Sequence, residues 1–238
     1  MTERNAGAGK VGARIKVSKD GPYLVEGTLP IAREIIVRDG DQIPTHWKRG
    51  EKLKDEEGVA LCRCGGSADK PFCDGAHNKN GFNGTETALK GPYSQAADLF
   101  EGPGIDLADD EELCSRLQFC HRAGGVWQVV EERGDDEACT IVREIAGNCA
   151  SGRLLAVEKE GTPYEPKFKM GVGVVEDPSR RMSGPLWISG GVPIISSDGV
   201  EYEVRNRVTL CRCGRSGNKP FCDGTHVDIK FRDGTERG

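Results

Sequence analysis

A sixteen-residue segment occurs twice in the chain, and this repeat constrains the fold more than any other feature. The first copy spans Cys62 to His77 and reads CRCGGSADKPFCDGAH. The second spans Cys211 to His226 and reads CRCGRSGNKPFCDGTH, so the copies differ at four of sixteen positions. The similarity continues upstream, where 21–31 corresponds to 184–194, and downstream, where 82–86 corresponds to 231–236. We infer that one compact module is used twice.

The residues around the repeats predict an α+β chain that is mostly β. Short β-branched and aromatic runs bounded by Gly, Pro and Asp predict strands at 15–17, 23–25, 34–37, 172–175, 186–189 and 201–205. The segment 38–58 is rich in Gly, Asp and Lys, which predicts an extended loop.

The segment between the repeats has a different character. Its stretch 98–112 holds seven acidic residues and no basic one, which predicts a solvated linker or helix face. Helical spacing of apolar residues predicts a helix over 138–146. We therefore expect a first module at 10–90, an inserted segment at 91–166 and a second module at 167–238.

Ten cysteines are the most informative part of the composition. The first nineteen residues lack the apolar stretch of a secretory signal, so we expect a cytoplasmic chain whose thiols bind metals or do redox chemistry. The net charge is −5, which argues against a nucleic-acid partner. No run of 18 apolar residues occurs, so the sequence predicts no membrane span.

Each sixteen-residue motif carries three cysteines and one histidine at spacings that suit metal binding. Cys62 and Cys64 are two apart, so in an extended segment their side chains share a face. Pro71 favours a short helix beginning near Cys73, and that helix would place His77, four residues on, on the same face. The second motif repeats this pattern.

Two metals suit such a set of four ligands. Zinc is often held by three cysteines and one histidine, although its paired cysteines usually have two to four residues between them. A [2Fe–2S] cluster takes two protein ligands on each iron, so C-x-C would serve one iron and C-x₃-H the other. Spacing alone leaves both readings open.

Both motifs resemble the signature of the mitoNEET-like CDGSH iron–sulfur family, C-x-C-x₂-(S/T)-x₃-P-x-C-D-G-x-H. Ser67, Pro71 and their counterparts Ser216 and Pro220 fall in register. The resemblance implies two small β-rich modules that form an intramolecular pseudo-dimer in a monomeric chain. It also implies two [2Fe–2S] clusters, each bound through iron, with ligands Cys62, Cys64, Cys73 and His77, and Cys211, Cys213, Cys222 and His226.

Four cysteines remain, and all of them lie in the inserted segment. Cys114 and Cys120 have C-x₅-C spacing, Trp127 follows, and Cys149 opens the sequence CASGRL. This pattern is similar to the divergent single-cluster [4Fe–4S] domain. In that domain Pro and Ala usually occupy the positions that Ala150 and Arg153 have here. The resemblance implies a ferredoxin-like α/β segment with a [4Fe–4S] cluster held by Cys114, Cys120, Cys149 and, by count, Cys139. His121 is an alternative fourth ligand, and a degenerate fold with buried free thiols is the alternative to a cluster.

The sequence contains no recognisable catalytic motif. It contains no nucleophile–base pair, no phosphate-binding loop and no dinucleotide-binding glycine pattern. We therefore expect an iron–sulfur protein that works in electron transfer, redox sensing or cluster transfer with a redox or cluster-acceptor protein. A zinc-binding structural or interaction module and a subunit of an oxidoreductase are the alternatives.

Overall fold

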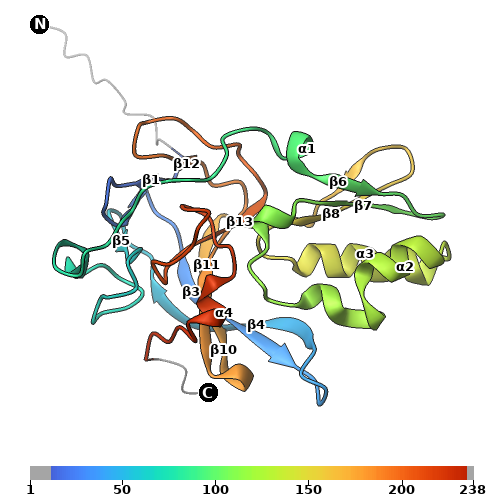
Figure 1. Cartoon of the computed structure of the whole chain (residues 1–238), viewed down its shortest axis with the longest axis horizontal. Coiled ribbons are helices and arrows are strands. Elements are labelled where there is room, and N and C mark those ends of the chain that lie inside the picture. The colour runs from blue at the N-terminus through green and yellow to red at the C-terminus, as the bar shows by residue number, and fades with distance from the viewer. Residues whose placement is uncertain (1–11, 235–238) are drawn as a thin grey trace, which may run out of the picture.

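Three small sheets organise the protein, and a computed structural model describes them over residues 12–234 (Figure 1). The first sheet has the strand order β12-β1-β2-β5 and the second has the order β13-β11-β10-β3-β4. The strands of the first are β1 Arg14–Val17, β2 Tyr23–Glu26, β5 Ala60–Leu61 and β12 Ile194–Ile195. Those of the second are β3 Ile31–Arg38, β4 Pro44–Lys54, β10 Gly171–Asp177, β11 Met182–Ser189 and β13 Arg207–Leu210. The fold is therefore mostly β, as predicted.

The two halves of the repeat exchange one strand with each other. β3 leaves the first half and pairs in parallel with β10 of the second, with Ile31 opposite Val172. β12 makes the reciprocal move and pairs in parallel with β1, with Ile194 opposite Ile15. Since 29–31 and 192–194 are equivalent positions of the repeat, the exchange is symmetrical. The chain is a pseudo-dimer built within one polypeptide.

A single apolar core lies between the first two sheets and draws on both halves. It contains Tyr23 and Val25 from β2 together with Leu186 and Ile188 from β11, all of them almost fully buried. Large apolar side chains in such a core contribute about 1.5–3 kcal/mol each. Because the core is shared, two modules with few aromatic residues stabilise each other.

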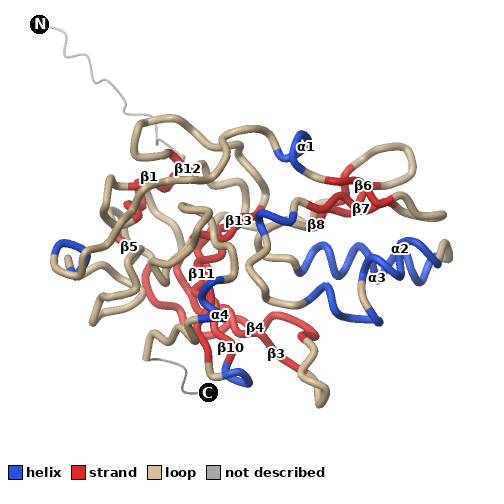
Figure 2. The backbone as a smooth tube through the Cα atoms, in the orientation of Figure 1, coloured by secondary structure: helices blue, strands red, loops and turns tan. Residues whose placement is uncertain are grey.

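The inserted segment forms a lobe of its own at the right of Figure 1. Its antiparallel sheet consists of β6 Asp98–Phe100, β7 Asp106–Asp109, β8 Leu154–Val157 and β9 Pro163–Tyr164. Helices α2 Val126–Glu132 and α3 Asp136–Asn148 pack on one face of this sheet (Figure 2). Asp135 caps α3 by accepting a hydrogen bond from the backbone N–H of Ala138. The helix predicted over 138–146 is confirmed.

Short helical turns connect the strands. α1 Tyr93–Ala96 and α4 Thr225–Asp228 each make one turn, and 3₁₀ turns occur at Ala76–Asn78, Glu111–Leu113, Phe119–Gly124 and Pro178–Arg180. Over residues 12–234, every helix is too short or too polar to cross a bilayer.

Five of the six predicted strands are confirmed, whereas the sixth strand and two other expectations are wrong. The predicted loop 38–58 contains the long strand β4, whose residues after Pro44 are exposed or only partly buried, so no apolar alternation marked it. The acidic stretch 98–112 forms β6 and β7 rather than a linker or helix.

The third error concerns the second half. Within 201–205 only Glu201 makes a bridge, and the strand lies instead at β13, Arg207–Leu210. Arg207 and Thr209 are polar but buried, because Arg207 donates hydrogen bonds to the carbonyls of Cys149 and Ala146 in the inserted lobe. Hydrogen bonds to the inserted lobe therefore allow Arg207 to be buried in β13, and no continuous apolar run marks this strand.

Candidate metal centres

The C-x-C segments bring their sulfurs to the spacing of two ligands on one metal. Cys62 and Cys64 follow β5, and their Sγ atoms lie 3.9 Å apart. Cys211 and Cys213 follow β13, and their Sγ atoms lie 3.7 Å apart. Two thiolates on one tetrahedral metal, with bonds of about 2.3 Å, are about 3.8 Å apart. Each C-x-C segment therefore has the geometry of a bidentate pair.

The C-x₃-H segments form a second pair in each motif. The Cys73 Sγ lies 3.5 Å from the His77 Nδ1, and the Cys222 Sγ lies 3.4 Å from the His226 Nδ1. The helix predicted to begin near Cys73 is wrong, because the 3₁₀ turn starts only at Ala76. Its preceding residue, Gly75, has a φ of 84°, which turns the chain so that cysteine and histidine still meet.

The aspartate of each Cys-Asp-Gly triplet explains why the chain turns there instead of forming a helix. The Asp74 carboxylate accepts hydrogen bonds from the backbone N–H groups of Ala68, at 2.8 Å, and Ala76, at 3.0 Å. These bonds lower the pKa of Asp74. Asp223 accepts the equivalent bonds from Gly217 and Thr225. A side chain that satisfies local N–H groups competes with helix formation and fixes the loop.

Backbone N–H groups also point at the sulfurs. The Gly66 N–H donates to the Cys64 Sγ at 3.4 Å and the Gly75 N–H donates to the Cys73 Sγ at 3.4 Å. In the second motif the Gly224 N–H donates to the Cys222 Sγ at 3.5 Å. Such donors stabilise negative charge on sulfur and tune the reduction potential of iron–sulfur sites.

The four candidate ligands of each motif form two pairs rather than one group. Over residues 12–234, no three His, Cys, Asp or Glu side chains converge closely enough to hold one metal ion. A mononuclear zinc site requires four ligands around one ion. The pairs fit a two-metal cluster, in which each metal takes two protein ligands.

The two motifs touch each other directly. Cys64 and Cys213 form a backbone bridge, and Gly65 and Gly214 flank it with φ values of 72° and 81°. A Cβ at position 65 would lie 2.5 Å from the Cys213 carbonyl oxygen, and a Cβ at position 214 would lie equally close to the Cys64 oxygen. Both glycines are required because a side chain would separate the motifs.

The two ligand sets differ in exposure. In the first set Cys64, Cys73 and His77 are partly exposed. In the second set all four residues are buried, and His226 is only 3% exposed. Burial, assisted by the positive charge of Arg212, lowers the pKa of His226 to about 4.

The inserted segment is what covers the second set. The aliphatic part of Arg116 lies against Gly224, and its guanidinium pairs with Asp228 at 2.6 Å. Arg116 and Leu117 line one small hollow together with His226. The inserted lobe does not cover the first set, because the first motif lies on the side of the pseudo-dimer away from that lobe (Figure 1).

Three of the four remaining cysteines come together in the inserted lobe. Cys114, Cys120 and Cys149 line one small pocket, which Leu117 and Arg153 also line. Arg153 pairs with Asp109 at 2.5 Å, and its guanidinium also interacts with Cys114. Burial and the two neighbouring thiols raise the pKa of Cys120 to about 12.

The structure separates Cys139 and His121 from this pocket. Cys139 lies in the first turn of α3 whereas Cys149 follows its last residue, and ten residues of helix rise about 15 Å. The expectation that Cys139 completes the set is therefore not met. His121 is exposed and lines a different hollow, beside Arg38 and Arg180.

Comparison with protein families identifies the repeated segments. Residues 20–78 and 183–227 match the model described as iron-binding zinc finger CDGSH type. Residues 100–159, between them, match the model described as divergent 4Fe-4S mono-cluster. The chain therefore carries two CDGSH-type iron-binding segments with a 4Fe-4S-type segment between them. No curated protein and no solved structure matches it.

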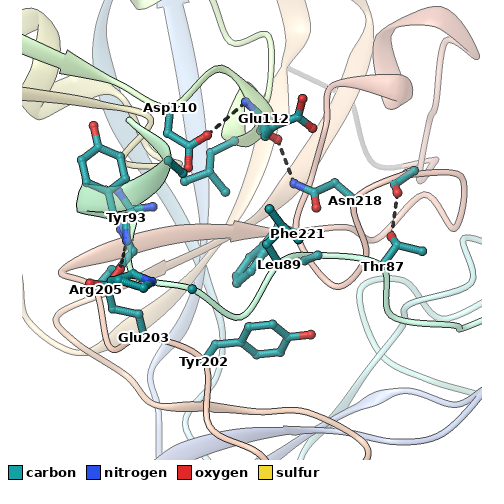
Figure 3. Close-up of a pocket in the computed structure, with 16 residues that line it drawn as sticks. Thr87, Leu89, Tyr93, Asp110, Glu112, Tyr202, Glu203, Arg205, Asn218 and Phe221 are labelled. Carbon is teal, nitrogen blue, oxygen red and sulfur yellow. Dashed lines mark hydrogen bonds between the residues drawn. The ribbon is translucent and has the colours of Figure 1, made fainter. Parts of the chain in front are cut away.

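The CDGSH-type chain has a pocket of about 350 Å³ where the linker, the inserted lobe and the second motif meet (Figure 3). Arg205 stacks over the Tyr93 ring at 4.2 Å, and the Tyr93 N–H donates to Glu203 at 2.8 Å. Asn218 donates to the Glu112 carbonyl at 2.8 Å, as Figure 3 shows. These contacts hold the inserted lobe beside Phe221, which directly precedes Cys222 in the second motif.

Sequence reasoning did not find Arg116 or Leu117 as residues of the CDGSH-type sites. Arg116 lies far from the second motif in the sequence and looks like an ordinary surface arginine. Nothing in the sequence places Leu117 beside the second motif, but its position midway between Cys114 and Cys120 could have placed it in the cysteine pocket of the inserted lobe, which it also lines.

Proposed function

We propose that this protein is a one-electron carrier with a [2Fe–2S] cluster in each CDGSH motif. The ligands would be Cys62, Cys64, Cys73 and His77 in the first motif and Cys211, Cys213, Cys222 and His226 in the second. When bound, such a cluster supplies a one-electron redox couple.

The paired arrangement of the ligands supports two metals in each motif. The sulfur–sulfur and sulfur–nitrogen pairs are 3.4–3.9 Å wide, and no third ligand joins either pair among residues 12–234. Zinc would draw all four side chains around one ion. The histidine is a neutral donor in place of an anionic thiolate, and this raises the reduction potential above that of all-cysteine sites.

The backbone bridge between Cys64 and Cys213 is the observation that best supports electron transfer. It holds the two ligand sets in backbone contact, with no segment of chain between them. The residues of the second set exclude water, whereas Cys64, Cys73 and His77 of the first set reach the surface. The first motif is therefore the side that faces a redox partner, and the second motif is an interior site.

Two matched variants test this assignment. Cys64→Ser removes a ligand of the exposed set and Cys213→Ser removes its buried counterpart. Iron, acid-labile sulfide and zinc are first measured in the anaerobically purified protein. The reduced proteins are then mixed with cytochrome c, a general one-electron acceptor, and the rate of oxidation is followed by absorbance.

We expect sulfide with iron, and about two irons fewer in each variant. Oxidation by cytochrome c should be much slower in Cys64→Ser than in Cys213→Ser. Colourless protein that holds zinc and no sulfide would refute the cluster assignment. Equal oxidation rates in the two variants would refute the first motif as the partner-facing side.

A further inference from the structure

We propose that the inserted lobe binds a three-iron [3Fe–4S] cluster through Cys114, Cys120 and Cys149. These three thiols line one pocket, and within residues 12–234 no other cysteine and no histidine lines it. A four-iron cluster takes one protein ligand on each iron. The pocket supplies thiolate ligands for three irons. The family model that matches this lobe is described as a four-iron cluster, so the ligands present do not fit that description.

The position that lacks a ligand is identified by the spacing of the cysteines. In bacterial ferredoxins the ligands follow the run C-x₂-C-x₂-C. In Cys114-Ser-Arg-Leu-Gln-Phe-Cys120 the outer two cysteines are present, and Leu117 stands where the middle one would be. Leu117 lines the same pocket as the three thiols. An alkyl side chain has no lone pair to offer to iron.

Packing around Leu117 also keeps water from serving as the missing ligand. Leu117 is 8% exposed and belongs to an apolar cluster with Phe119, Val175 and Trp187. Trp47 stacks on Phe119 in this cluster, at 4.9 Å between ring centroids. A fourth iron beside Leu117 would be bound by sulfides alone, and we infer that the bound cluster lacks this iron.

The two candidate replacements lie too far away. Cys139 is separated from Cys149 by about 15 Å of helix α3, and its sulfur packs against Gly104 in the core of the lobe. His121 is exposed in a separate hollow. Neither residue lines the pocket.

A partly buried arginine at the pocket supports an anionic group there. The Arg153 guanidinium is held by Asp109 through two hydrogen bonds, at 2.5 and 2.8 Å, and it also interacts with Cys114. Its side chain is 13% exposed, so the charge is only partly screened by solvent. Three thiolates around an iron–sulfur core carry net negative charge, which this arginine offsets.

Iron content and EPR spectroscopy of the full-length, anaerobically reconstituted protein test the proposal. Three ferric ions hold an odd number of electrons, so an oxidised [3Fe–4S] cluster is paramagnetic. Oxidised [2Fe–2S] and [4Fe–4S] clusters hold even numbers and give no such signal. We expect about seven irons per chain and an EPR signal in the oxidised protein.

Three variants separate the possible outcomes. Leu117→Cys should bind one more iron and lose the oxidised-state signal, because a fourth thiolate completes the site. Cys139→Ser should keep both the iron and the signal of the parent protein. Cys114→Ser should lose the signal and about three irons, leaving about four. The total count rests on the proposed [2Fe–2S] sites, but the difference between parent and Cys114→Ser does not.

The proposal is wrong if Cys114→Ser binds about four irons fewer than the parent protein and the oxidised parent protein gives no EPR signal. It is also wrong if Cys139→Ser abolishes the signal, or if Cys114→Ser changes neither iron nor signal. Failure of the CDGSH sites would appear separately, as fewer than about four irons in Cys114→Ser. If Leu117→Cys does not fold, the other two variants still decide.

Discussion

Replacing Gly65 by alanine should break the contact between the two CDGSH motifs. Gly65 has a φ of 72°, in the left-handed region, and its missing Cβ would lie 2.5 Å from the Cys213 carbonyl oxygen. That oxygen belongs to backbone, so it cannot rotate away as a side chain would. Position 58 offers a matched control, because Gly58 also has a φ of 72° but no atom lies within 4 Å of its Cβ position.

The expected loss of stability can be divided between the two causes. A left-handed conformation costs an alanine about 1–2 kcal/mol. Overlap with packed atoms adds about 1–3 kcal/mol. Gly58→Ala should therefore lower the free energy of unfolding by the first amount alone, and Gly65→Ala by about 2–5 kcal/mol. Gly214→Ala should resemble Gly65→Ala, since its Cβ would meet the Cys64 oxygen at the same 2.5 Å.

Urea unfolding followed by circular dichroism measures these differences from the shift of the midpoint at constant slope. The iron content of each variant reports whether the ligand sets survive. If Gly65→Ala and Gly58→Ala are equally destabilised, the close approach of the motifs contributes nothing and the reasoning fails.

Two further predictions concern the shared core. Burial raises the pKa of Glu176 from 4.5 to about 7, so its folded carboxyl holds a proton that the unfolded one releases. The contribution of Glu176 to stability should therefore be largest below pH 4.5 and fall by about 3 kcal/mol as the pH rises to 8. An equal slope of stability against pH in Glu176→Gln would contradict this. Tyr23→Phe removes the buried hydroxyl that donates to the Cys211 and Pro220 carbonyls at 2.8 and 2.9 Å, and urea unfolding should show a loss of about 1–3 kcal/mol. An unchanged midpoint, like that expected for the exposed Tyr164→Phe, would show that these carbonyls find other partners.

The sequence by itself determined the parts of the protein that depend on near neighbours. The spacing of Cys62 and Cys64 predicts a bidentate pair, and the structure places their sulfurs 3.9 Å apart. The apolar spacing of 138–146 predicted α3, because helical periodicity is a local property. The resemblance of the duplicated motif to the CDGSH family implied a pseudo-dimer, and the structure confirms it with one apolar core that draws on both halves.

Tertiary structure alone decided which side chains from distant segments meet. The strand exchange of β3 and β12 depends on pairing between segments far apart in the sequence, and no local pattern shows which strand pairs with which. The edge strand β4 carries no apolar alternation of its own. Arg116 covers His226, and Cys139 is kept from Cys149 by the length of a helix. Counting cysteines grouped four together, but the rigid rise of α3 leaves three in the pocket. The packing of the lobe, which composition does not encode, therefore determines which of the four cysteines line one pocket.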